Sequence, residues 1–339
     1  MGSSYYDVIV LGTGVSALTS AALLAKRGFR VLVLGQQSPA PDYRLGKWRL
    51  PRQPFAFTAT HTPLGRRILG ELGLAQSLRR KAQALEPALQ LALPGHRLDL
   101  FGSELELERE FEREFPEVKR PILDFLRRVA ERAAATDALF ERDITWPPDS
   151  LFERRELARL GARLGLGSEG PDRLLGELPE AHPFRCAVRA LLSFGVHAEP
   201  TSLTALQITR VLNGRVREPQ AFEGGLAGLC ELLSEKIRAH SGHLRLEERA
   251  SQIGVRRAAV SGVRLFGSDE ELGCASVIAA GDVASVQRLL LDRRPFEELF
   301  ERLGEPQPRF YRFTLNALVA EQGIPGGMQR DVFFVRDRD

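Results

Sequence analysis

Cysteine and histidine are scarce in this sequence. Its 339 residues include three cysteines and six histidines. Cys186, Cys230 and Cys274 are far apart and form no Cys-x-x-Cys pair, and the histidines show no spacing typical of metal ligands. These patterns suggest neither a disulfide framework nor a metal site. Because no arrangement of serine, histidine and aspartate stands out either, we assign no catalytic residue and no metal ligand.

Long apolar runs are also lacking. No stretch approaches the roughly 18 consecutive apolar residues of a membrane span, and the N-terminus has no charged segment followed by an apolar signal core. The sequence therefore predicts a cytoplasmic location. The net charge is only +3, and arginine is mixed with glutamate over residues 104–117 and 153–159. This mixture is typical of a solvated helical surface and predicts no nucleic-acid partner.

The strongest pattern that is present covers residues 6–37. An apolar run at residues 8–11 predicts a buried strand, Gly12 and Gly14 predict a tight turn, and residues 16–27 have helical spacing that ends at Gly28. Residues 31–34 predict a second buried strand. A strand, glycine turn, helix and strand in about 30 residues form one βαβ unit. Such a turn lets the backbone approach a pyrophosphate; the alternative is an ordinary βαβ turn.

One element of a dinucleotide site is missing. The second strand should end at an acid that binds the adenosine ribose hydroxyls, but here it ends in Gly35, Gln36 and Gln37. Gln36 can still accept a hydrogen bond through its amide oxygen, although it carries no charge. The basic and aromatic stretch at residues 43–50 follows; it could reach a pyrophosphate or a flavin ring, for example through Lys47, or it could be a surface loop with a partly buried Trp48.

Residues 65–220 are expected to be helix-rich and poor in catalytic residue types. Two alternating runs around Pro94-Gly95-His96 predict a hairpin. Helices are predicted at residues 63–74, 105–115, 119–142, 151–164, 171–178, 184–194 and 201–212, the last capped by Thr201 or Ser202. Six apolar residues could line a substrate channel or belong to the ordinary core: Leu191, Leu192, Phe194, Val196, Leu203 and Leu206.

The sequence pattern typical of a nucleotide-binding domain returns after residue 221. We expect a long helix to His240, strands at residues 244–247 and 253–256, a hairpin within residues 258–266 through Ser261-Gly262, a buried strand at 275–281 and a helix at 282–291. This order resembles the flavin amine oxidase superfamily, and specifically the phytoene desaturase family of carotenoid enzymes. Leu-Pro-Gly-His-Arg-Leu-Asp-Leu at residues 93–100 and residues 315–328 are similar to segments of that family.

The resemblance implies an α/β fold, in which a Rossmann-like FAD-binding domain, with a parallel sheet, helices and a β-hairpin or meander, accompanies a helix-rich substrate domain with a small antiparallel sheet. The implied ranges are 1–64 and 221–295 for the FAD-binding domain, and 65–220 and 296–339 for the substrate domain.

The resemblance also implies a cofactor and its site. FAD would lie with its pyrophosphate over Gly12, Thr13, Gly14, Val15, Ser16 and Ala17. The ribose would lie near Gly35 and Gln36, the backbone of Ala250 would contact adenine, and Ala280 and Gly281 would approach the cofactor. The flavin would take a hydride from a lipophilic, isoprenoid-like substrate, and peripheral membrane contact is conceivable because such substrates partition into membranes.

Three departures from the family bear on this expectation. The ribose acid is missing, and the family's Gly-Gly-Arg motif has only residues 45–49 as a counterpart. The family also continues past the position of Asp339 with a final strand and a glycine-rich helix that faces the flavin, so residues 332–336 are expected to leave an unpaired strand edge. The sequence thus predicts a truncated or split enzyme, with a second chain completing the flavin site, or a degenerate relative that binds a lipid or a protein. An NAD-linked enzyme is the third reading.

Overall fold

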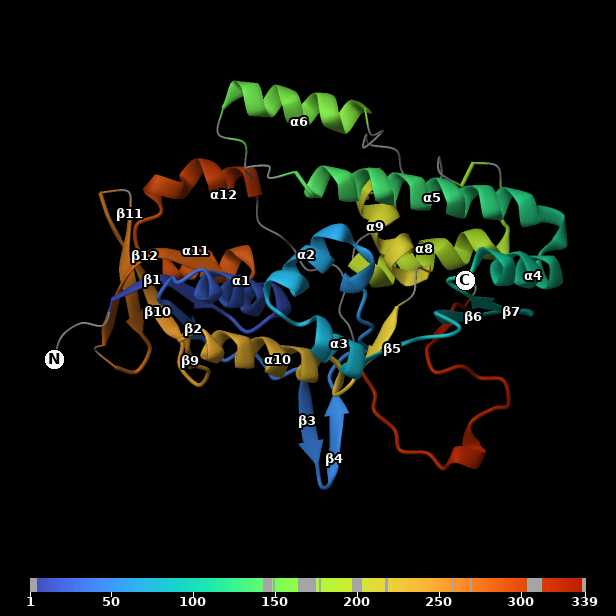
Figure 1. Ribbon diagram of the computed structural model, residues 1–339, viewed down its shortest axis with the longest axis horizontal. Helices are drawn as coiled ribbons and strands as arrows, with labels where there is room; N and C mark the ends of the chain where they lie inside the picture. The colour runs from blue at the N-terminus through green and yellow to red at the C-terminus, as the bar shows by residue number, and fades with distance from the viewer. Residues whose placement is uncertain are drawn as a thin grey trace. The chain divides into compact units, whose positions relative to one another are not determined.

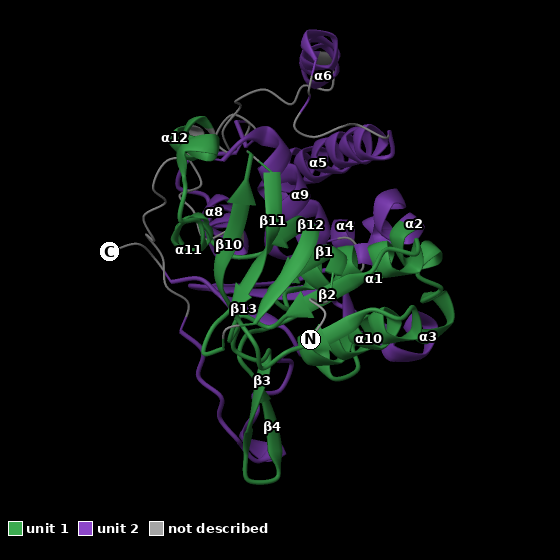
Figure 2. Cartoon of the chain, turned by 90° about the vertical axis from the view of Figure 1, so that its left-hand side faces the viewer, with its two compact units in different colours: residues 1–55, 68–77, 222–308 green, residues 56–67, 78–221, 309–339 purple. Residues whose placement is uncertain are grey.

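The computed structural model describes residues 5–142, 148, 150–163, 175–176, 178–196, 203–216, 219–257, 259–268, 270–303 and 313–336. The chain divides into two compact units (Figure 2). Unit 1 comprises residues 1–55, 68–77 and 222–308, and unit 2 comprises residues 56–67, 78–221 and 309–339. The α/β fold class is therefore confirmed, while the predicted domain ranges stay a prediction; residues 68–77 and 296–308 lie in unit 1.

Unit 1 is built on a six-stranded sheet (Figure 1). Its strand order is β10-β11-β12-β1-β2-β9. Its strands are β1 (Tyr5–Leu11), β2 (Val31–Leu34), β9 (His243–Arg245), β10 (Ala250–Arg256), β11 (Ala259–Leu265) and β12 (Glu271–Ala279). Strand β1 is parallel to both β2 and β12, and its last residue Leu11 is level with Leu34 and Ala279. The carboxyl ends of three parallel strands therefore meet at one edge, where open α/β sheets bind their ligands.

Among the described residues, the helices that lie entirely in this unit are α1 (Val15–Lys26), α10 (Gly225–Ala239), α11 (Val283–Leu289) and α12 (Glu297–Leu303). Helix α1 packs against β2 and α10, and it can do so closely because Ala21, Ala22 and Ala25 form much of its buried face. The helix begins directly after Gly14. The glycine turn is thus held rigidly between a buried strand and a buried helix.

The structure corrects two predictions in unit 1. Ser261 and Gly262 were expected at a hairpin turn, but they lie inside the continuous strand β11, and the connection to β10 follows Arg256. Residues 43–50, for which a surface loop was one of two readings, lie in a hairpin of β3 (Asp42–Leu45) and β4 (Trp48–Pro51). Its turn is possible because Gly46 has a φ of 59°, which favours glycine. Trp48 is about half exposed.

Unit 2 is rich in helices around a three-stranded sheet in the order β13-β6-β7. Its helices and strands are α2 (Pro63–Glu71, which continues into unit 1), α4 (Glu104–Glu114), α5 (Lys119–Phe140), α6 (Leu151–Arg163), α8 (Pro183–Val196), α9 (Ala205–Val216), β5 (Ala82–Ala84), β6 (Leu89–Leu93), β7 (His96–Leu100), β8 (Gln220–Phe222) and β13 (Val332–Phe334). Helix α3 (Ala75–Lys81) links the two units along the chain. The β6–β7 hairpin confirms the predicted turn at Pro94-Gly95.

The core of unit 2 settles the position of most of the candidate channel residues. Leu191, Leu192 and Leu203 are buried in its main apolar cluster, and the Phe194 ring packs against Phe333 at a centroid distance of 5.3 Å. The three leucines therefore belong to the core of unit 2. The Val196 side chain, most of the predicted helix at 171–178 and the predicted caps Thr201 and Ser202 lie outside the described residues. Helix α9 begins at Ala205, four residues later than predicted.

Strand β13 pairs in parallel with β6. Within the described residues it is an edge strand of this sheet, as the sequence predicted.

None of the described helices is long and apolar enough to cross a membrane. Among the same residues, no group of three or more His, Cys, Asp or Glu side chains is placed to hold a metal ion.

Candidate functional site: the nucleotide turn and its grooves

The glycine turn after β1 is held open at the sheet edge. Gly12 has a φ of 110°, and its amide donates to the Leu34 carbonyl at 2.8 Å. Gly14 precedes α1 in an extended conformation and provides no side-chain cap. No described atom lies within 4 Å of a Cβ built on Gly14. The first amides of α1 have no acceptor within the helix, so the turn presents donors and a positive helix end to open space.

The end of β2 explains why the ribose acid is absent. A Cβ built on Gly35 would lie 1.8 Å from the Leu246 carbonyl oxygen. Real side chains never approach backbone atoms so closely, and the Gly35 amide itself donates to the Arg245 carbonyl at 3.2 Å. The chain after β9 therefore occupies the position that an acidic side chain at residue 35 would need.

Two grooves border this sheet edge within unit 1. The strand-end groove has a volume of about 670 Å³ and is lined by Gly12, Gln36, Arg249, Ala250, Ala280 and Gly281, among others. Five of these six residues were predicted to contact the cofactor. The helix-side groove, of about 740 Å³, includes Thr13, Gly35, Asp42, Arg49, Cys230 and Glu231. The structure thus brings most of the predicted residues together; their role in binding stays a prediction.

The strand-end groove contains buried polar atoms without partners. Gln36 Nε2 and Arg249 Nε are buried, and neither has a hydrogen-bond partner within the described part of the chain. Buried polar atoms in proteins are nearly always satisfied, so such atoms in a groove indicate a missing partner. A nucleotide supplies oxygen and ring-nitrogen acceptors for both donors. The residues present therefore fit the adenosine end of a dinucleotide, even though the acid is absent.

The remaining predicted residues occupy different positions. Val15 and Ser16 begin α1, and Ala17 is buried beneath the turn. Lys47 lies at the turn of the β3–β4 hairpin, where its ammonium is 5.0 Å from the centre of the Trp48 ring, and it lines neither groove. The hairpin directs the Lys47 side chain onto its own tryptophan, which gives this residue a local contact.

Sequence reasoning missed Arg249 and Cys230. Arg249 directly precedes the predicted adenine contact Ala250, which was the available signal. The Cys230 thiol lies 3.9 Å from the Thr13 carbonyl oxygen in the helix-side groove, and burial raises the pKa of this thiol. Cys230 is therefore a protonated, unreactive thiol near neutral pH.

Asp282 caps α11 at the rim of the strand-end groove. Its carboxylate accepts hydrogen bonds from the Ser285 hydroxyl at 2.6 Å and the Ser285 amide at 2.8 Å. These two bonds, the hydroxyl first, lower the pKa of Asp282. A carboxyl with a lowered folded-state pKa stabilises the protein above its unfolded pKa of about 3.9, and this stability is lost as the pH falls through the folded-state pKa.

We expect Asp282→Ala to lower the free energy of unfolding by about 1 kcal/mol at pH 7, the usual value of an N-cap. The difference from the wild type should shrink as the pH falls below about 4, where the carboxyl of the unfolded chain takes up a proton, and further as the pH falls through the lowered folded-state pKa. Urea unfolding of both proteins at pH 7 and pH 3 measures this change. Asp282→Asn is the matched control, because asparagine still caps the helix but does not titrate. If the free energies of unfolding of the wild type and Asp282→Ala differ by the same amount at both pH values, the cap does not depend on an ionised Asp282 carboxylate.

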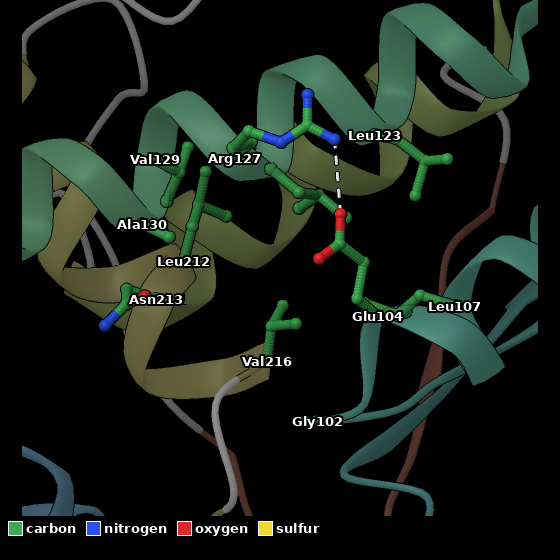
Figure 3. A pocket seen from close by; sticks show the side chains of 11 residues that line it. Gly102, Glu104, Leu107, Leu123, Arg127, Val129, Ala130, Leu212, Asn213 and Val216 are labelled. Atoms are coloured by element: carbon green, nitrogen blue, oxygen red, sulfur yellow. Dashed lines mark hydrogen bonds and ion pairs between the residues drawn. The ribbon is translucent and has the colours of Figure 1, made fainter.

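Unit 2 holds a small apolar pocket between α4, α5 and α9 (Figure 3). Its volume is about 90 Å³, and most of its lining is apolar: Leu107, Leu123, Val129, Ala130, Leu212 and Val216. Glu104 and Arg127 also line it and form an ion pair at 3.2 Å. A dry apolar cavity of about 150 Å³ can hold benzene, so this pocket has room for only a few carbon atoms.

Ala130→Leu should fill this pocket with little loss of stability, or with a gain of about 1 kcal/mol. Ala133→Leu, one turn along α5, is the control, because Ala133 is 1% exposed in the packed core. Overpacking there should reduce the free energy of unfolding by roughly 1–3 kcal/mol. Thermal unfolding of both variants compares the two positions, and equal losses would mean that the pocket is not open space.

The comparisons with known proteins agree with this geometry. Residues 10–72 match the family model of the NAD(P)-binding Rossmann-like domain. The chain is 41% identical over 49 residues to monodechloroaminopyrrolnitrin halogenase PrnC of Pseudomonas fluorescens, a match that covers 14% of this chain and 8% of the halogenase.

Two solved structures share the fold over most of this chain. An oxidoreductase from Methanosarcina mazei aligns with a TM-score of 0.56 and 15% identity, over 87% of this chain and 64% of that one. RAB GDI from Plasmodium falciparum aligns with a TM-score of 0.53 and 14% identity, over 85% and 67%. The chain therefore spans about two thirds of the length of these proteins. Residues 10–72 thus match a Rossmann-like family model, and the chain shares the α/β fold of these solved structures.

Proposed function

We propose that this chain is an FAD-dependent oxidoreductase. The observation that carries the proposal is the combination of the open, uncapped start of α1 at Gly14 with the unpartnered donor Gln36 Nε2 in the adjoining groove. The amides at residues 12–17 would hold the pyrophosphate, while Gln36, Ala250, Ala280 and Gly281 would hold the adenosine end. Bound FAD would accept a hydride from the substrate, so the protein needs no acid or base of its own for that step.

The proposed substrate is an apolar, isoprenoid-like molecule, as in phytoene desaturases. The resemblance of residues 93–100 and 315–328 to that family supports this choice. A cytoplasmic location, with peripheral contact to the membrane that dissolves such a substrate, belongs to the same proposal.

A second chain that completes the flavin site is a further part of the proposal. This part rests on the family resemblance. Separately, the sheet of unit 2 offers an open edge, since among the described residues β13 has a neighbouring strand only on the β6 side. An open edge presents unpaired backbone donors and acceptors to another strand.

The alternative is a non-catalytic protein that binds a lipid or a protein partner with the same fold. RAB GDI shares the fold with a TM-score of 0.53, and Gly35 leaves no space for the acid that usually holds the ribose. This reading predicts that apolar ligands bind with or without flavin.

Anaerobic reduction of bound flavin separates the two functions. Protein loaded with FAD is mixed with phytoene in detergent micelles, and the flavin absorbance is followed. The enzyme reading predicts that the absorbance bleaches and returns when oxygen is admitted, whereas putrescine, a polar control, has no effect. Bound flavin that no apolar substrate bleaches, together with saturable phytoene binding, would favour the non-catalytic function instead.

A further inference from the structure

The end of β2 carries no negative charge, and the structure prevents it from carrying one. An acid at this point bonds the free ribose hydroxyls of an adenine dinucleotide and repels a 2′-phosphate, while a nearby arginine accepts that phosphate. Gly35 cannot bear a side chain, because the Leu246 carbonyl oxygen lies where its Cβ would be. The residues that follow, Gln36 and Gln37, are neutral. The repulsion that excludes a 2′-phosphate is therefore absent.

Hydrogen-bond donors take the place of the acid. Gln36 Nε2 and Arg249 Nε are both buried and lack partners within the described residues, and both side chains line the strand-end groove. An amide N–H and a guanidinium N–H can only donate from these atoms. Phosphate oxygens are acceptors, and arginine binds them with strong, charge-assisted hydrogen bonds.

The Arg249 guanidinium is held in place before any ligand binds. Its Cζ lies 3.4 Å from the centre of the Phe266 ring, and its Nη1 donates to Gln37 Oε1 at 2.8 Å. The backbone reinforces this arrangement, since the Phe266 amide donates to the Arg249 carbonyl at 2.9 Å. A group fixed in this way loses little conformational entropy when it binds a ligand.

The other charged side chains of the strand-end groove do not neutralise the positive charge of Arg249. Asp282 and Arg288 also line it. Both Asp282 carboxylate oxygens accept from Ser285, and Arg288 Nη2 donates to the Ser285 hydroxyl oxygen at 2.8 Å. The groove thus carries two guanidinium groups and one carboxylate, and that carboxylate is already hydrogen-bonded. This balance favours an anionic ligand.

We propose that the strand-end groove binds adenosine whose ribose carries a 2′-phosphate, so that NADP(H) competes with FAD for it. The inference rests on the nucleotide site of the proposed function, but not on its flavin chemistry. Gln36 and Arg249 are the residues that select the phosphate.

Binding of three mononucleotides to the full chain tests the inference by calorimetry. The compound 2′,5′-ADP carries the phosphate of NADP, 5′-AMP lacks it, and 3′,5′-ADP has the same groups at a different position. We expect 2′,5′-ADP to bind roughly tenfold or more tightly than 5′-AMP, as one charge-assisted hydrogen bond can provide, and more tightly than 3′,5′-ADP. NADP⁺ should also displace FAD.

Three variants show which residues are responsible. Arg249→Met keeps an apolar stem over Phe266 and should abolish the preference for 2′,5′-ADP over 5′-AMP. Gln36→Glu is isosteric and should reverse the preference, because its carboxylate repels the phosphate. Arg264→Met is the control, because Arg264 on β11 pairs with Glu271 on β12 and does not line the groove. The nucleotide preference of this variant should equal that of the wild type. If Arg249→Met does not fold, the reversed nucleotide preference of Gln36→Glu tests the inference by itself.

The outcomes separate this inference from the proposed function. Equal affinity for 2′,5′-ADP and 5′-AMP in a protein that binds FAD would overturn the inference alone. A preference for 2′,5′-ADP in a protein that binds no FAD would overturn the proposed function and uphold the inference. A preference that survives in both Arg249→Met and Gln36→Glu would show that these residues do not select the phosphate, and failure of all nucleotides to bind would overturn both proposals.

Discussion

Gly14→Val is expected to abolish dinucleotide binding without unfolding the protein. Gly14 has φ and ψ of −65° and 162°, which valine adopts readily, and a Cβ there meets no described atom within 4 Å. The folded state should therefore keep its stability. The added methyl groups would instead occupy the space over the first amides of α1, where the pyrophosphate must approach. We expect FAD affinity to fall by at least about 100-fold, equivalent to roughly 2.7 kcal/mol.

Fluorescence titration with FAD and thermal unfolding of the free protein measure the two halves of this prediction. Gly70→Val is the control, because Gly70 also has open space around it but lies on α2, outside both grooves. If Gly14→Val binds FAD as the wild type does, the pyrophosphate is not at this turn.

Gly35→Glu is expected to destabilise the protein strongly, although it restores the acid that dinucleotide sites usually carry. Its Cβ would be 1.8 Å from the Leu246 carbonyl oxygen, so the chain after β9 would have to move. Since a backbone cannot rotate away as a flexible side chain can, we expect a loss of about 3 kcal/mol in the free energy of unfolding. Gly35→Ala should show most of the same loss, because the clash arises at Cβ.

Urea unfolding of Gly35→Glu and Gly35→Ala measures this effect. Gly281→Ala, in the neighbouring strand-end groove, is the matched control, since its Cβ would meet only the Ser285 Cβ at an ordinary 3.9 Å. Wild-type stability in Gly35→Glu, combined with tighter FAD binding, would mean that the Leu246 segment moves aside easily. The absence of the acid would then have no steric cause.

The strand, turn, helix and strand at the start of unit 1 could be predicted because local sequence signals and tertiary structure agree there. Residues 8–11 and 31–34 are short β-branched or leucine runs, and glycines mark the turn and the end of the helix between them. The error at Ser261-Gly262 has a clear physical cause. Gly262 is required inside β11, because a Cβ there would lie 2.5 Å from the Leu272 carbonyl oxygen. In the sequence, a glycine required by such close strand packing looks the same as a glycine in a turn.

The candidate site could be predicted only where it depends on the chain's own local pattern. Gly12, Ala280 and Gly281 follow strands that the sequence identifies, and the parallel register brings them to one edge. The contact between Gly35 and the Leu246 carbonyl joins segments that are distant in the sequence, so no local pattern indicates it. The Arg249 position on Phe266 likewise depends on the β10–β11 register, in which Ala250 is level with Leu265.

Titration of the purified protein with FAD tests the central claim most directly. A ligand at a concentration far above its dissociation constant stabilises the folded state by roughly 2–4 kcal/mol. The midpoint temperature of unfolding should therefore rise progressively as FAD is added, and the protein should retain a yellow chromophore after gel filtration. FMN, which lacks the adenosine end, should stabilise much less. A colourless protein whose unfolding is unchanged at saturating FAD would contradict the account.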